Sequence, residues 1–493
     1  MPLYVINTSR NGRPLLSKSS AIISLALALI LAFPAFPAIS QAQPGGVSEE
    51  WMGVYLNGKK AGYASTITRE VSGGYEVKED LDAVLSVLGF GQEIKMTTTS
   101  RLSGTLSVKD ISFAMDAGIA RTSISGRMSG KALALRITDS AGDAQDKRID
   151  FDEPPYVSAS VSLFLSRQDL KPGSRFTLPY FDPSTLSREP LYLEVDGIEQ
   201  MKVGDKAVPV YRVSEEYAGM TTRSWFTKEG GTIKGDGPMG FTFVRESKEQ
   251  AMKPPDGGYQ PEDIIAMASI PADVNITEPD KVVFLKARLS GADFGGLDIG
   301  GGRQLFSGNV VEVTREDLGK EKPVSLPVKD PALAVYLKPE PYVQSDEPAI
   351  RAKASELTAG ESDVISAARK IADWVNASLE KKPSAGIPDA AEVLKGLSGD
   401  CNEHTVLFTA LARAAGIPAK MDAGVVMVGG RFYYHAWPEV WAGRWVAVDP
   451  TFGQFPADAT HIRLEEGGLD RQVRITKLMG RMKVAILGYK AQQ

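Results

Sequence analysis

The chain of 493 residues has very little cysteine and histidine: one cysteine, Cys401, and three histidines. A single cysteine cannot form an internal disulfide, so the fold cannot depend on a disulfide framework. The scattered histidines, without a His-Glu-x-x-His motif or paired cysteines, argue against a zinc site, and we expect neither a metal nor a cofactor. The lone thiol therefore needs an explanation of its own.

The chain also lacks an excess of positive charge. It has 56 basic and 61 acidic residues, a net charge of −5, and no concentrated basic stripe that could follow a phosphate backbone. Nucleic-acid binding is therefore not expected. Hydrophobic residues make up 43% and charged residues 24%, which excludes a largely disordered chain and a multi-span membrane protein. The length predicts about three domains.

The N-terminus has the order of a secretory signal peptide. The first 20 residues carry three basic side chains and no acid, an apolar run covers 21–33, and Pro34, Pro37 and the small residue Ala42 follow. We expect cleavage after Ala42, which would take the net charge from −5 to −8. An uncleaved anchor is the alternative, but the prolines break the end of the run. We therefore expect a periplasmic or secreted protein without an integral membrane span.

Most of the chain that follows is predicted to be β-structure. Between 43 and 252, turn dipeptides such as Asn57-Gly58 separate short segments rich in Val, Ile, Thr, Tyr and Leu, which predicts a large antiparallel β domain. Prolines and glycines near 253–258 suggest a boundary. A smaller β segment is expected over 259–322, and a proline-rich linker over 323–345.

The period of the pattern changes after the linker, and 346–493 is predicted to form an α+β domain. Helices are expected over 364–379, with Thr358 and Glu361 as a capping box, from Asp389 to near Gly396, and over 401–415. The expected strands cover 421–428, 432–441 and 445–449, with one or two more over 473–489. Helices followed by strands are typical of an α+β fold.

Cys401 is predicted to stand at the start of the third of these helices. Free backbone N–H groups and the positive end of the helix dipole favour a thiolate there, which makes Cys401 a candidate nucleophile. The alternative is a buried, inert cysteine, a common fate of a single thiol.

His435 and Asp449 are the candidate partners of this thiol. Opposed residues of an antiparallel hairpin have a constant index sum, and a hairpin centred on Ala442 places His435 opposite Asp449. The carboxylate could then accept from one imidazole nitrogen while the other faces the thiol, although a slip of one residue would separate the two faces. The other histidines receive different interpretations: His404 shares a stripe with Leu407 as a core histidine, and His461 is expected to be solvated in a polar loop.

Four blocks of sequence resemble the transglutaminase-like superfamily in order and spacing. They are 399–404 (GDCNEH), 411–419 (LARAAGIPA), 435–440 (HAWPEV) and 445–450 (WVAVDP). The resemblance covers about 364–460 and implies a papain-like α+β fold, with Cys401 as nucleophile, His435 as general acid and base, and Asp449 as the orienting acid.

The resemblance also implies acyl transfer through a thioester. With water as acceptor the enzyme would be a peptidase or amidase, and with an amine it would crosslink its substrates. The resemblance to exported bacterial-type members favours hydrolysis of protein or cell-wall peptides. The competing interpretation is a non-catalytic envelope module that keeps the fold and binds a partner.

Overall fold

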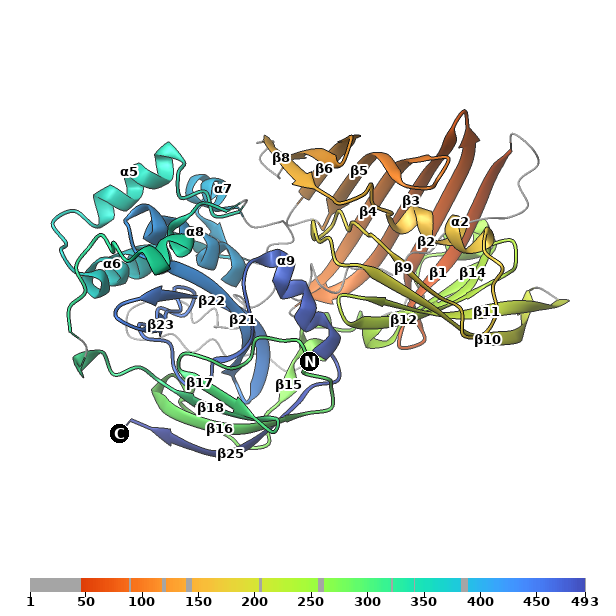
Figure 1. Cartoon of the computed structure of the whole chain (residues 1–493). Coiled ribbons are helices and arrows are strands. Elements are labelled where there is room, and N and C mark those ends of the chain that lie inside the picture. Colours follow the sequence, from red (N-terminus) through yellow and green to blue (C-terminus); the bar gives the residue numbers. More distant parts are fainter. Residues whose placement is uncertain are drawn as a thin grey trace.

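The structure is a computed structural model that describes residues 46–492, with gaps at 88–89, 118–120, 139–143, 204–205, 256–260, 321, 341 and 383–388. The predicted signal peptide over 1–42 lies outside the described residues. Figure 1 shows two bodies: a broad β-sheet formed by the first half of the chain and an α+β body formed by the second half.

In the residues that the structure describes, the first body contains one antiparallel sheet of fourteen strands, which confirms the predicted large antiparallel β region. Strand β1 (Val47–Leu56) lies inside the sheet, between β2 (Lys59–Val71) and β14 (Phe241–Glu246). The chain meanders from β2 to one edge at β8, and from the other edge at β9 back to β14. The remaining strands are β3 (Gly74–Val87), β4 (Phe90–Ser103), β5 (Val108–Asp116), β6 (Arg121–Ser129), β7 (Ala132–Thr138), β8 (Ala144–Asp150), β9 (Arg175–Leu178), β10 (Leu191–Val203), β11 (Lys206–Tyr217), β12 (Met220–Phe226) and β13 (Thr232–Asp236).

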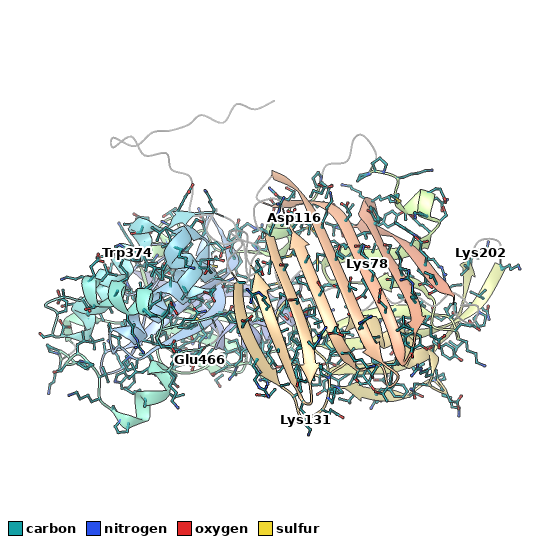
Figure 2. The ribbon with its side chains drawn as sticks, turned by 90° about the horizontal axis from the view of Figure 1, so that it is seen from above. Lys78, Asp116, Lys131, Lys202, Trp374 and Glu466 are labelled. Atoms are coloured by element: carbon teal, nitrogen blue, oxygen red, sulfur yellow. The ribbon has the colours of Figure 1, made fainter. Side chains whose placement is uncertain are left out.

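Alternation along the strands produces the core of this sheet. In β5, Ile111, Phe113 and Met115 are buried, while the residues between them face outward. Asn57 and Gly58 both have positive φ, 49° and 78°, as a tight hairpin turn between β1 and β2 requires. Figure 2 shows the resulting strands side by side in one broad sheet.

Short helices cover the sheet and connect it to the second body. A 3₁₀ helix, η2 (Ser158–Ser160), and helix α2 (Val161–Ser166) pack on the sheet, and α3 (Lys248–Ala251) follows β14. In α4 (Ile264–Ala268), Ile264 and Ile265 belong to the core of the first sheet, whereas Ala268 belongs to a core of the second body. Helix α4 therefore joins the two hydrophobic cores.

Two main sheets lie in the described part of the second body. One has the order β17, β18, β16, β25, and the other has the order β15, β22, β21, β24 with β23 paired to β22. The strands expected within 259–322 thus share a sheet with the C-terminal strand. The bounds are β15 (Ile270–Pro271), β16 (Val282–Ser290), β17 (Gln304–Ser307), β18 (Val310–Thr314), β21 (Ala419–Val428), β22 (Arg431–Trp441), β23 (Trp445–Ala447), β24 (Ile462–Glu466) and β25 (Lys483–Ala491).

Helices pack beside the second of these sheets (Figure 1). Asp363, and not the predicted pair of Thr358 and Glu361, caps α6: its carboxylate accepts from the N–H groups of Ile365 and Ser366. Thr358 instead ends helix α5, which the sequence analysis did not predict. The helices are α5 (Pro348–Leu357), α6 (Val364–Ser378), α7 (Ala390–Gly396), α8 (Cys401–Ala414) and α9 (Leu469–Gln472).

The proline-rich segment is packed against this body. The Val328 N–H donates to the carbonyl oxygen of Gly416 at 3.0 Å, and the Leu326 N–H donates to the carbonyl oxygen of Ser362 at 2.9 Å. Residues Pro331–Leu337 form a 3₁₀ helix, η6, which begins at Pro331 after its cap, Asp330. In the described part of the chain, no helix combines the length and the apolar composition needed to cross a membrane.

Candidate active site

Helix α8 begins at Cys401, as the sequence predicts, because Asp400 and Glu403 form a reciprocal capping box. The Asn402 N–H donates to the Asp400 carboxylate at 3.0 Å, and the Asp400 N–H donates to Glu403 at 2.9 Å. Gly399, at φ 150°, fits against this turn, since a Cβ there would lie 2.4 Å from the Cβ of Glu403. The capped turn fixes Cys401 at the helix N-terminus.

Strand β22 brings His435 to this helix terminus. The backbone N–H of Ala436, the residue after His435, donates towards the Cys401 thiol. On the other side of the ring, His435 Nε2 lies 2.9 Å from Asp449 Oδ2. His435 Nδ1 is buried and has no hydrogen-bond partner among the described residues. Asp449 therefore holds the imidazole through Nε2, while Nδ1 is free and the next residue along the strand contacts Cys401.

The hairpin register differs from the prediction. Trp441 pairs with Trp445 and Glu439 with Ala447, so the hairpin is centred on Gly443 and not on Ala442. When the centre of the hairpin shifts by one residue, the residue opposite any given position shifts by two. Residues two apart on a strand point to the same face of the sheet, so the facing side is unchanged. His435 and Asp449 consequently still meet, although β23 ends at Ala447 and Asp449 lies just beyond it.

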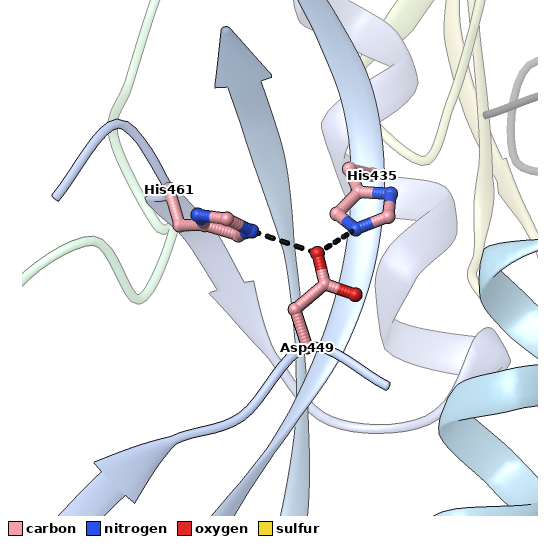
Figure 3. A group of neighbouring side chains, drawn as sticks. All are labelled: His435, Asp449 and His461. Atoms are coloured by element: carbon pink, nitrogen blue, oxygen red, sulfur yellow. Dashed lines mark hydrogen bonds and ion pairs between the residues drawn. The ribbon is translucent and has the colours of Figure 1, made fainter. Parts of the chain in front are cut away.

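A dense set of hydrogen bonds holds the Asp449 carboxylate. Oδ1 accepts from the N–H groups of Thr451 and Phe452 at 2.8 and 2.9 Å. Oδ2 accepts from two imidazoles, His435 and His461, each at 2.9 Å (Figure 3). Asp449 therefore orients two histidines at once.

His461 is buried, with 1% of its surface exposed, so the prediction of a solvated loop residue is wrong. Its Nδ1 lies 3.3 Å from the Asp458 carboxylate, and its Nε2 faces Asp449. The polar sequence of this loop does not indicate exposure to solvent, because the loop packs against Asp449. There the buried side chains of Asp458 and His461 bond to each other. The spacing Asp-x-x-His at 458–461 was the available signal.

Charge pairing in this network outweighs desolvation. Burial by itself would raise the pKa of Asp449, but His435 and His461 hold it well below its usual range. Burial would lower the pKa of His461, but Asp458 and Asp449 raise it to about 9. At neutral pH the centre is therefore a carboxylate beside a protonated His461.

The Cys401 thiol differs from expectation. Burial, and then the negative charge of Asp400, raise its pKa well above the usual value, and the Ala436 N–H opposes this only in part. The predicted preference for thiolate at the helix N-terminus is therefore wrong for this fully buried side chain, because desolvation exceeds the effect of the helix terminus. Cys401 is a thiol at neutral pH.

His404 lies inside the molecule, as a core histidine should. Its Nδ1 is 2.6 Å from the carbonyl oxygen of Asp400, and burial lowers its pKa to about 4, so the ring is neutral. Its Nε2 is buried without a hydrogen-bond partner among the described residues.

Aromatic rings enclose His435. The Phe452 ring stacks on the imidazole at 4.8 Å between centroids and an angle of 6°, and Trp437 stacks at 6.1 Å.

The ligand atoms of His435, Asp449 and His461 lie within 4.8 Å of one another, close enough for a metal ion. Each imidazole Nε2 is, however, engaged with the same carboxylate oxygen, and the raised pKa of His461 keeps a proton where a metal would need a lone pair. This chemistry fits a hydrogen-bonded relay better than a metal site.

Comparison with protein families agrees with this architecture. Residues 351–450 match the model of the transglutaminase-like superfamily. The α+β part of the chain is a transglutaminase-like domain. Residues 75–234, within the N-terminal sheet, match a family described as protein of unknown function DUF3108. No curated protein matches the chain.

Solved structures also resemble parts of the chain. A candidate cysteine protease from Cytophaga hutchinsonii is 17% identical, with 43% of this chain and 90% of that chain covered and a TM-score of 0.29. A β-barrel-like DUF1849 protein from Brucella abortus is 12% identical, with 40% and 94% covered and a TM-score of 0.30. A candidate protease from Parabacteroides distasonis is 12% identical, with 76% and 68% covered and a TM-score of 0.19.

Proposed function

We propose that the transglutaminase-like domain is a thiol enzyme that transfers acyl groups from amide bonds, with Cys401, His435 and Asp449 as its catalytic triad. The observation that carries the proposal is the imidazole of His435, which bonds to Asp449 through Nε2 and leaves a buried Nδ1 without a partner among the described residues. The next residue, Ala436, donates its N–H towards Cys401 at the start of α8. An orienting acid, a base and a nucleophile in this order are the components of such catalysis.

The raised pKa of Cys401 indicates how the first step proceeds. Because the resting side chain is a thiol, the proton passes to His435 Nδ1 while sulfur forms its bond to the carbonyl carbon. His435 then gives this proton to the leaving amine as the C–N bond breaks, which leaves a thioester on Cys401. Water attacks the thioester, with His435 again as base, and releases a carboxylic acid and the thiol. An amine in place of water would give transamidation.

The substrate class we propose is protein or cell-wall peptide, with hydrolysis as the main outcome. The test is to incubate the protein with purified peptidoglycan peptides or casein, with and without a primary amine, and to analyse the products by mass spectrometry. New carboxyl termini that are absent with Cys401→Ala support a hydrolase, and amine adducts support transamidation. Identical products from both proteins would contradict the proposal.

The burial of the site favours one alternative function. Cys401, His435 and Asp449 are each 0% exposed, so a substrate reaches the thiol only if the site opens. A non-catalytic envelope module would need no such opening. In that case Cys401→Ala would leave every function of the protein unchanged.

We also propose export of the protein, from the basic, apolar and small-residue order of the first 42 residues. The mature chain would begin at Gln43 and be released with the soluble envelope fraction. Mass spectrometry of that fraction tests this, and an intact Met1 terminus recovered with the membranes would contradict it.

A further inference from the structure

A cavity of about 130 Å³ lies within the N-terminal sheet. Residues of β2–β5 line it from one half of the sheet, residues of β10–β12 and β14 line it from the other half, and the loop over 180–184 completes its wall. In Figure 1 these two halves are the red to orange strands and the yellow to green strands. A cavity of about 150 Å³ can hold benzene, so this one has room for a small organic group.

The charged side chains that line the cavity, among the described residues, are acidic. The lining includes four carboxyl side chains and, among the described residues, no lysine, arginine or histidine. Asp80 has its own ion pair with Lys78 at 2.7 Å. The other three carboxyl groups come from different segments: Glu79 of β3, Asp182 of the loop and Glu215 of β11. Asp182 and Glu215 are buried, and Glu79 is half-buried.

Glu215 has the least satisfied of these carboxyl groups. The side chain is 3% exposed, Ser224 is its polar neighbour, and its Oε1 makes no hydrogen bond of good geometry among the described residues. Glu79 accepts from Ser158 at 2.7 Å, and Asp182 accepts from Ser184 and Thr185. A buried carboxyl oxygen without a partner costs free energy, which a ligand carrying hydrogen-bond donors and a positive charge would recover.

Two aromatic rings lie beside these acids. Tyr180 and Tyr217 both line the cavity, with centroids 5.1 Å apart and an angle of 67°. The Tyr217 hydroxyl is buried, and Ser187 and Thr185 are its polar neighbours. Tyrosine faces attract organic cations, and paired rings next to carboxylates are suited to an ammonium group.

The spacing of the acids separates an organic cation from a metal ion. Among the described residues, the set of three or more ligand side chains with atoms within 4.8 Å of one another is His435, Asp449 and His461, and not the cavity acids. A metal ion needs its oxygen ligands at about 2.0–2.6 Å, which requires convergence on one point. Separated carboxyl groups with apolar walls fit a ligand that has both a charged end and a hydrocarbon part.

We propose that this cavity binds the primary ammonium end of a small organic ligand, with Glu215 and Glu79 as counter-ions and the rings of Tyr180 and Tyr217 beside the cation. The proposal is independent of the Cys401 site. It assigns to the N-terminal sheet a ligand-binding function of its own.

The proposal predicts that ligand binding is coupled to the release of protons. Burial raises the pKa of Glu79 and of Glu215 to about 7, and it also raises the pKa of Asp182, Tyr180 and Tyr217. A cation favours the carboxylate form, so binding near neutral pH should release protons, and the affinity should increase from pH 6 to pH 8.

Calorimetry with the full chain tests this, using butylamine as the probe and 1-butanol as its neutral analogue. We expect butylamine to bind at pH 7 with heats that differ between buffers of different ionisation enthalpy, and 1-butanol to bind at least about tenfold less tightly. Glu215→Gln should weaken butylamine by about tenfold or more, because it removes a charged hydrogen bond. Glu216→Gln, on the exposed side of the same strand, is the matched control and should bind as the unchanged protein does.

Tyr217→Leu gives a second variant if Glu215→Gln does not fold, and it should weaken butylamine binding because it removes one of the two rings beside the cation. The comparison of butylamine with 1-butanol needs no variant. The proposal is overturned if butylamine does not bind, if 1-butanol binds equally well, or if Glu216→Gln weakens binding as much as Glu215→Gln.

Discussion

At the scale of single residues, Asp449 determines the electrostatics of the candidate site. One carboxylate oxygen serves His435 and His461, while the other receives two backbone N–H groups. The protonated His461 therefore shares one carboxylate oxygen with His435. In the proposed reaction, the proton of the Cys401 thiol moves only as sulfur forms its bond to the substrate, because burial keeps the pKa of the thiol above its usual value.

Removing Asp449 should destabilise the fold as well as the chemistry. Asp449→Ala leaves the buried His461 cation with Asp458 alone, and we expect a loss of about 3 kcal/mol at pH 7. Adding His461→Phe should restore part of that loss, because the unpaired cation is then absent. Urea unfolding of the four proteins measures the coupling. Strictly additive losses would show that the two residues do not interact.

His461 should make stability depend on pH. Its pKa is raised from 6.5 to about 9, so its contribution is complete below pH 6.5 and is lost as the pH rises through 9. The change amounts to roughly 3 kcal/mol for a fully buried group. Urea unfolding at pH 6.5 and pH 9.5 measures it, and His461→Gln should reduce the difference by that amount. An unchanged difference in the variant would assign the pH dependence to other groups.

At the scale of elements, the sequence predicts the helices and strands whose apolar residues recur regularly. It does not predict turns and loops, which have no such regular pattern. The stripe of α8 and the strands that follow were predictable from apolar spacing. The exact turn between β22 and β23 was not predictable, because a loop with one glycine is compatible with a hairpin centred on Ala442 or on Gly443. His461 was missed because a polar loop gives no periodic signal of burial.

The cap of α6 provides a test at this scale. Asp363→Ala should lower the free energy of unfolding by about 1 kcal/mol, since two N–H groups of the first turn lose their acceptor. Glu361→Ala removes a partly exposed ion pair with Lys370 and should change stability by less than about 0.5 kcal/mol. Denaturant unfolding compares the two. Equal losses would mean that the cap contributes no more than the surface pair.

At the scale of the whole molecule, the order of a large β region and an α+β domain was predictable, but long-range pairing was not. Nothing in the local pattern of 483–491 indicates that β25 pairs with β16, some 200 residues earlier in the chain. The proline-rich segment looked like a linker because prolines interrupt regular structure. In the structure its backbone groups bond to the α+β body.

Fragments should reflect this pairing. We expect 262–493 to fold cooperatively, because it contains β16–β18 with their partner β25. The fragment 346–493 leaves β25 without β16 and should not fold cooperatively. Circular dichroism during thermal unfolding distinguishes them. A cooperative transition of the shorter fragment would show that the four-stranded sheet is dispensable.

The central claim is that His435 activates Cys401 for acyl transfer, and the most direct measurement is the labelling rate of Cys401 by a peptidyl acyloxymethyl ketone. Mass spectrometry locates the adduct, and His461→Gln controls for changes in the surrounding network. We expect labelling at pH 7 that falls by at least about 100-fold in His435→Ala, because the buried thiol then lacks its base. Equal labelling of the two proteins, or no labelling of either, would contradict the catalytic assignment and favour the binding module.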